Sequence, residues 1–234
     1  MKYAFTNGII LDGTQDMKPQ TNLCILVQDG KITDIVPDTT DLHDYRIIDL
    51  HGHYILPGLI NMHVHLAGSG KPQKKQRDNE KLVHTIMGSS LTRVIAYKMV
   101  AGFAKDELLG GVTTIRTVGG LGSFDTRLRD EIEAGTKTGP RILASNQGIS
   151  VPGGHMAGSV AVAASSVPDA LAHLEQSEKE KVDLIKLMIT GGVLDAKEKG
   201  VPGELKMPPE MVRAICEKAH ADGYLVAAHV ESPE

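Results

Sequence analysis

Residues 1–56 alternate short apolar runs with glycine-containing turns, a pattern that is typical of β-strands. Asp29-Gly30 lies between LCILVQ and KITDIV and predicts a β-hairpin. Asn7-Gly8 and Asp12-Gly13 have the same composition, and we interpret them as hairpin turns too. The segment is expected to be a small β-rich domain, with strands at 3–6, 9–11, 23–28, 31–36 and 46–49.

After Pro57-Gly58 the pattern changes to apolar runs that alternate with longer segments of helical periodicity. Such alternation predicts βαβ units and a parallel sheet. We expect helices at 79–109 with a break near Gly88, and at 123–134, 169–180 and 208–222. The expected strands are 59–64, 112–117, 140–145, 182–189 and 224–230.

The length of this α/β part leaves two architectures open. It spans 234 − 57 = 177 residues, enough for between five and six βα units at ~31 residues each. A closed eight-unit barrel takes ~250 residues. The sequence therefore predicts either an open doubly wound sheet or a barrel that stops early, directly after its fifth strand.

Composition excludes several classes of partner. The formal net charge is −4 and only 3% of the residues are aromatic, so a nucleic-acid-binding surface is not expected. No window approaches the ~20 apolar residues of a membrane span, and the first residues do not resemble a signal peptide. Two cysteines cannot form a disulfide framework, which favours a reducing, cytoplasmic location.

Three histidines are expected at strand ends. His63 and His65 are two residues apart at the end of the first α/β strand, so both imidazoles point to the same side. His229 ends the fifth strand. Ligands of α/β folds bind at the carboxyl ends of the strands, and imidazoles there suit a divalent metal such as zinc. The alternative is strand-end histidines that hydrogen-bond to loops.

Lys186 lies inside the apolar strand DLIKLMI, where a lone ammonium is costly. A neutral lysine amine is reactive, either as a Schiff-base former or toward CO₂. The alternative is a side chain that snorkels to the surface or pairs with an acid such as Asp183. His155 follows two glycines in a loop, where it is placed to contact a carbonyl or a carboxylate, unless the loop is merely flexible.

Five stretches, in this order along the chain, resemble the metal-dependent amidohydrolase superfamily, in its imidazolonepropionase-like and Xaa-Pro or Xaa-Arg dipeptidase-like branch. The resemblance implies that 57–234 is the N-terminal part of a (β/α)₈ TIM-like barrel, cut after the fifth barrel strand. Residues 1–56 would be the N-terminal part of a composite β-sandwich. The stretches are ILPGLINMHVHL, GGVTTIRTVGG, GPRILASNQGISVPGGHMAG, VDLIKLMITGGV and YLVAAHVESPE.

The resemblance also implies roles for the residues already named. His63 and His65 would ligate one metal, His229 a second, and Lys186, carboxylated by CO₂, would bridge the two. His155 would contact the substrate. The metal is expected to be zinc, although Mn, Co or Fe also fit these ligands. The implied activity is hydrolysis of a C–N bond in a small amide, cyclic amide or dipeptide by metal-activated water.

The sequence departs from the family pattern at several points. Asn61 and Thr117 stand where the family has aspartates. The family's metal histidine after strand six and its acid–base aspartate after strand eight have no counterpart up to Glu234, so no catalytic acid–base residue is assigned. An alternative function is therefore a catalytically incomplete fragment or assembly module, in a homo-oligomer or with a complementing C-terminal chain. A third is a Lys186 Schiff-base lyase.

Overall fold

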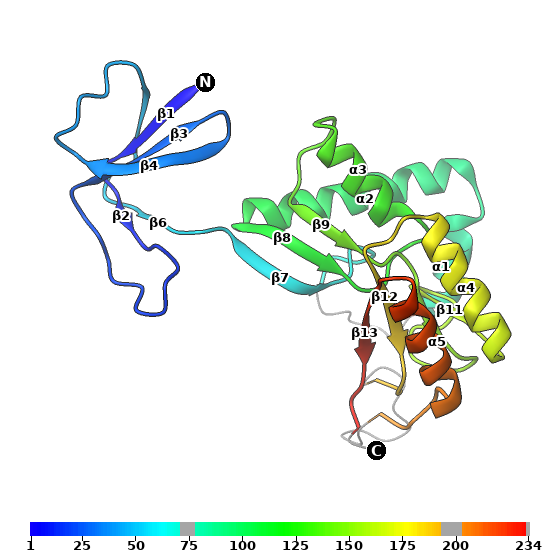
Figure 1. The fold of residues 1–234 in the computed structure, drawn as a ribbon. Helices are drawn as coiled ribbons and strands as arrows, with labels where there is room; N and C mark the ends of the chain where they lie inside the picture. The colour runs from blue at the N-terminus through cyan, green and yellow to red at the C-terminus, as the bar shows by residue number, and fades with distance from the viewer. Residues whose placement is uncertain (71–77, 193–202, 233–234) are drawn as a thin grey trace. The chain divides into compact units, whose positions relative to one another are not determined.

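The structure is a computed structural model that describes residues 1–70, 78–192 and 203–232. The chain divides into two compact units, Met1–Gly58 and Leu59–Glu234. Figure 1 shows strands in the first unit and alternating strands and helices in the second. The sequence predicted this boundary two residues earlier, after residue 56.

The first unit contains a four-stranded sheet of order β4-β3-β1-β5 and a parallel pair, β2-β6. The predicted Asp29-Gly30 hairpin is confirmed: it joins antiparallel strands, and both residues have positive φ, at 51° and 78°. The strands are β1 (Lys2–Thr6), β2 (Ile9–Ile10), β3 (Leu23–Gln28), β4 (Lys31–Pro37), β5 (Arg46–Asp49) and β6 (Tyr54–Ile55).

The other two predicted hairpins are wrong. β1 pairs with β3 and β5, and β2 pairs with β6, so neither Asn7-Gly8 nor Asp12-Gly13 connects neighbouring strands. Gly8 serves close packing instead, because a Cβ there would lie 2.4 Å from Cδ1 of Leu50. Pairing between distant segments therefore overrides the local turn signal.

In the second unit, α2 packs on β8, α3 on β9, α4 on β10 and α5 on β13. Its strands form two parallel sheets, β7-β8-β9 and β11-β10-β12-β13 (Figure 1). The strands are β7 (Leu59–Val64), β8 (Val112–Thr117), β9 (Arg141–Ala144), β10 (Gly148–Ser150), β11 (Ala161–Ala163), β12 (Leu184–Met188) and β13 (Leu225–His229). The helices are α1 (Asn79–Met87), α2 (Ser90–Leu109), α3 (Phe124–Glu133), α4 (Val167–Lys179) and α5 (Pro209–Ala221).

The predicted helix break is confirmed. α1 ends at Gly88, and the hydroxyl of Ser89 accepts a hydrogen bond from the amide of Thr92 to cap α2. At the start of α3, Ser123 makes no side-chain capping bond. The amide oxygen of Asn146 accepts from the backbone N–H of Thr126 instead, at 3.0 Å.

The sequence missed β10 and β11. The expected strand 140–145 ends at Ala144, and Asn146, with φ of 54°, turns the chain before β10 begins. β10 then pairs with β11 and β12. The change of direction at Asn146 is what separates the two sheets.

Two apolar clusters support this unit. One lies between α2, α3 and the first sheet and includes Val100, Ile115 and Leu128. The other lies between α4, α5 and the second sheet and includes Leu174 and Ile215. In the part of the chain that the structure describes, no helix is long and apolar enough to cross a membrane.

Candidate active site

The His63 and His65 side chains converge at the end of β7. Their Nε2 atoms are 3.2 Å apart, with the rings edge to face. Nδ1 of His65 lies 3.0 Å from the carbonyl oxygen of Gly119. Because a carbonyl only accepts, this contact places the hydrogen of a neutral His65 on Nδ1 and leaves the lone pair on Nε2. The Oδ1 atom of Asn61 accepts from the backbone N–H of His63 and holds the strand end.

This pair fits a metal ion. Two imidazole nitrogens on one tetrahedral zinc, each at ~2.05 Å, lie ~3.3 Å apart, close to the observed 3.2 Å. The pKa values of both histidines are lowered, first by burial and then by the charge of Lys186, while the Gly119 carbonyl partly offsets the shift of His65. Both rings therefore favour the neutral form that binds metals.

Lys186 is buried in the middle of β12, with 3% of its surface exposed. Burial lowers the pKa of its ammonium to about 8, and the nearby Arg116 guanidinium adds to the effect. The alternative pairing with Asp183 is wrong, because that carboxylate accepts from Arg129 at 2.8 Å and from the backbone N–H of Ala144. Lys186 is thus a buried amine with an increased neutral fraction.

His155 and His229 form a second pair. Their rings stack with centroids 4.0 Å apart and planes 9° from parallel. His229 ends β13, and its Nε2 lies 3.4 Å from the Gly191 carbonyl and 3.7 Å from Glu231. A Cβ on Gly192 would lie 2.6 Å from two ring atoms of His155, so a residue without a side chain is required there.

The predicted site residues therefore belong to two sheets. His63 lies on β7 and His65 directly follows it, whereas Lys186 and His229 come from β12 and β13. The Lys186 charge lowers the pKa of His229 as well, after the larger effects of burial and His155. Within the described ranges, there is no group of three or more His, Cys, Asp or Glu side chains that could hold a metal ion without a further ligand.

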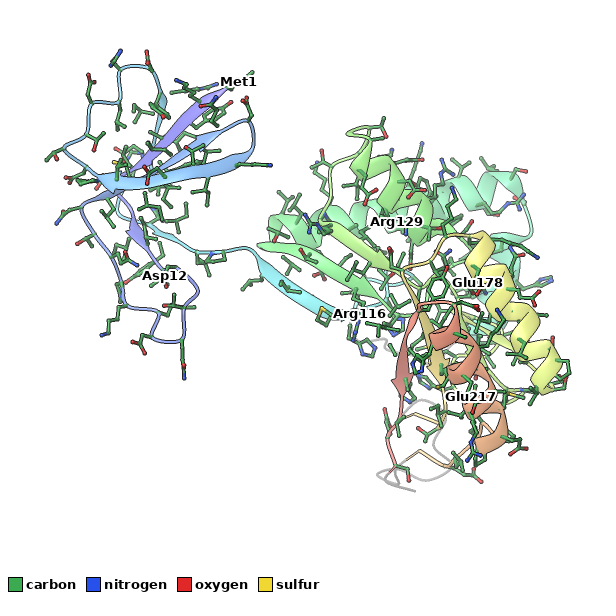
Figure 2. All side chains as sticks on the ribbon, in the orientation of Figure 1. Met1, Asp12, Arg116, Arg129, Glu178 and Glu217 are labelled. Carbon is green, nitrogen blue, oxygen red and sulfur yellow. The ribbon has the colours of Figure 1, made fainter. Side chains whose placement is uncertain are left out.

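Sequence reasoning missed two charged residues beside these groups. Arg116, labelled in Figure 2, lies on β8, and its Nε donates to the carbonyl of Met62 at 2.8 Å. The strand alternation of VTTIRT could have placed it on the same face as Thr114. Asp125, in the first turn of α3, is 1% exposed; no local pattern marks it as buried.

Comparisons with known proteins identify the family of this chain. The model of the amidohydrolase family matches residues 54–234. A dihydroorotase from Syntrophus aciditrophicus is 36% identical over 76 residues, which is 32% of this chain and 17% of that protein.

Two solved structures are similar over almost the whole chain. A putative prolidase from Bifidobacterium longum is 34% identical with a TM-score of 0.75, over 100% of this chain and 50% of that one. A Xaa-Pro dipeptidase with methionine bound in its active site is 28% identical with a TM-score of 0.75, over 98% of this chain and 57% of that one. The chain thus spans about half the length of these structures, and less than a fifth of the dihydroorotase. The expected α/β fold of a partial amidohydrolase barrel is confirmed.

Proposed function

Because the chain belongs to the amidohydrolase family, we propose that it hydrolyses a C–N bond in a small amide, with a dipeptide as the preferred substrate class. Divalent metal, most simply zinc, would be held by His63, His65, Lys186 and His229. When bound, the metal acidifies a water molecule and polarises the scissile carbonyl.

The convergence of His63 and His65 is the observation that carries the proposal. Their Nε2 atoms have the spacing of two ligands on one ion, and the Gly119 carbonyl sets the tautomer of His65. Metal-ligating histidines typically donate their other ring N–H to a carbonyl or a carboxylate, as His65 does to Gly119. The chemistry of the donors therefore fits a metal better than it fits a packing role.

Lys186 would contribute through a carbamate. Its neutral amine attacks CO₂, forming an N–C bond and releasing one proton. The product carries an anionic carboxylate in place of a cation, which removes the unfavourable buried charge and supplies oxygen ligands. Together with His63, His65 and His229, the carbamate oxygens would supply donors for a binuclear site.

The dipeptide class is supported by sequence identity to two solved structures. The prolidase and the Xaa-Pro dipeptidase are 34% and 28% identical to this chain over 98–100% of its length. His155 is the residue we assign to the substrate's carbonyl or carboxylate group. Its ring is held flat against His229 and is 8% exposed.

The test is metal content and hydrolysis measured on the same preparation. We expect bound zinc, and metal-dependent cleavage of Xaa-Pro dipeptides that exceeds cleavage of dihydroorotate or hydantoin. His63→Asn should lose both zinc and activity, and His220→Asn, which changes an exposed histidine of α5, should lose neither. A zinc-loaded protein that cleaves no C–N bond, or an active His63→Asn variant, would refute the proposal.

Exposed strand edges favour assembly as a second candidate. β7 and β13 are the outer strands of their sheets, and Ile60 and Leu225 on them are 64% and 77% exposed. We propose that these edges pair with another polypeptide, either a second copy or a C-terminal chain. Native mass spectrometry should show a species heavier than 25.1 kDa. A stable monomer at micromolar concentration would exclude this assembly.

A further inference from the structure

The carboxyl group of Asp125 is buried beside the hydroxyl of Thr117. The residue is 1% exposed, and neither of its oxygens makes a hydrogen bond of ordinary geometry within the described ranges. Burial raises its pKa to about 6, and the nearby Thr117 hydroxyl lowers it in part. A buried, unsatisfied carboxyl destabilises a fold, so a specific role is expected.

The carboxyl packs against the backbone of a glycine turn. A Cβ on Gly120 would lie 2.4 Å from Oδ2 and 3.0 Å from Oδ1 of Asp125, so the acid fills the space of a side chain at 120. The preceding Gly119 has a φ of 131° and faces the His65 ring, since a Cβ there would lie 3.1 Å from its Nδ1. The turn is therefore held between a carboxyl group on one side and an imidazole on the other.

The helix that carries Asp125 is itself fixed at this end. Asn146 accepts from the N–H of Thr126 at 3.0 Å and donates to its hydroxyl at 3.0 Å. The same Asn146 amide donates to Glu180 at 2.8 Å. Since these bonds anchor the first turn of α3 to the chain after β9, Asp125 is a rigid support.

We propose that Asp125 is a positioning residue: it holds the Gly119-Gly120 turn so that the Gly119 carbonyl keeps His65 in its Nδ1–H tautomer, with Nε2 directed at His63. The proposal rests on the proposed function in one respect, which is the identity of the metal ligand role of His65 Nε2. The role of Asp125 in holding the turn does not depend on it. The support is steric, so an uncharged group of the same shape serves equally well.

The first test reads the tautomer directly in metal-free protein. Long-range ¹H–¹⁵N spectra at pH 7.5 report which ring nitrogen carries the hydrogen, with His65→Asn identifying the signal. We expect Nδ1–H in the wild type and in Asp125→Asn, and a mixture of tautomers in Asp125→Ala. Asp130→Ala, which removes a carboxylate that is 61% exposed on the same helix, should have no effect.

A second pair of variants covers the case in which Asp125→Ala does not fold. Gly120→Ala introduces the Cβ that overlaps the carboxyl, and should disturb the His65 tautomer. The double variant Gly120→Ala/Asp125→Ala removes the overlap and should restore Nδ1–H. A tautomer that stays unchanged in Gly120→Ala, or in a folded Asp125→Ala, would overturn the proposal.

Zinc affinity gives an independent measurement. Chelator competition should show a roughly tenfold loss for Asp125→Ala, and less than a twofold change for Asp125→Asn and Asp130→Ala. A loss of thermal stability in Asp125→Ala with unchanged zinc affinity would mean a structural role only, against the proposal. Failure of the wild type to bind zinc would refute the proposed function, and the tautomer measurement would still decide the role of Asp125.

Discussion

Replacing Asp125 by asparagine should change how stability depends on pH. The folded carboxyl has a pKa of about 6 against its ordinary 3.8, so the unfolded chain releases this proton at a lower pH. The group therefore makes the wild type less stable as pH rises from about 4 to 6, and the loss stays constant above that range. Each pKa unit corresponds to ~1.4 kcal/mol. The cost of ionisation is then roughly 2 kcal/mol at pH 5 and roughly 3 kcal/mol at pH 7.5.

The assay is urea unfolding followed by circular dichroism at 222 nm, since all described helices lie in residues 59–234. The free energy of unfolding of Asp125→Asn should gain roughly 1 kcal/mol on the wild type between pH 5 and pH 7.5. The change with pH is the test, because the absolute difference also includes the packing of the new amide. Asp130→Asn, at an exposed position, is the control and should follow the wild type. If Asp125→Asn follows the wild type as well, Asp125 does not have a raised pKa.

Three further predictions concern the surrounding residues. Lys186→Met should raise the unfolding free energy of metal-free protein by ~3 kcal/mol at pH 7, because the pKa of the buried ammonium is lowered to about 8. Denaturant titrations should show that this gain in stability becomes smaller as the pH rises from 8 to 10.5. Asp183→Ala should cost ~2 kcal/mol by removing the charge-assisted bond to Arg129, and the lost stability should not return in the Arg129→Ala double variant. Gly192→Ala places a Cβ 2.6 Å from the His155 ring and 3.1 Å from Nε2 of His229, so it should raise the KM for dipeptides and lower the zinc content measured by mass spectrometry.

Features that depend on neighbours in sequence were predictable. The Asp29-Gly30 hairpin needs only two residues with positive φ between apolar strands. The break at Gly88 likewise follows from a glycine and the Ser89 cap. In both cases the local backbone preference and the tertiary fold agree.

Features that depend on distant contacts were not predictable. Asn7-Gly8 has the composition of a hairpin turn, but β1 is paired with β3 and β5. β10 and β11 have three residues each, too short to show periodicity in a glycine-rich segment. The pair of His63 and His65 could be placed by alternation along one strand, whereas the stack of His155 on His229 joins a loop to the end of a strand far away in sequence.

The division of the second unit into two sheets has a consequence for its motions. Each sheet has its own apolar core, and a backbone bond from Asp183 to Ala144 is one of the links between them. A ligand bound by residues of β7 and also by residues of β12 or β13 would connect the two sheets, which are otherwise able to open separately. Loading the site would then make the amide hydrogens of both sheets exchange together, as one cooperative body.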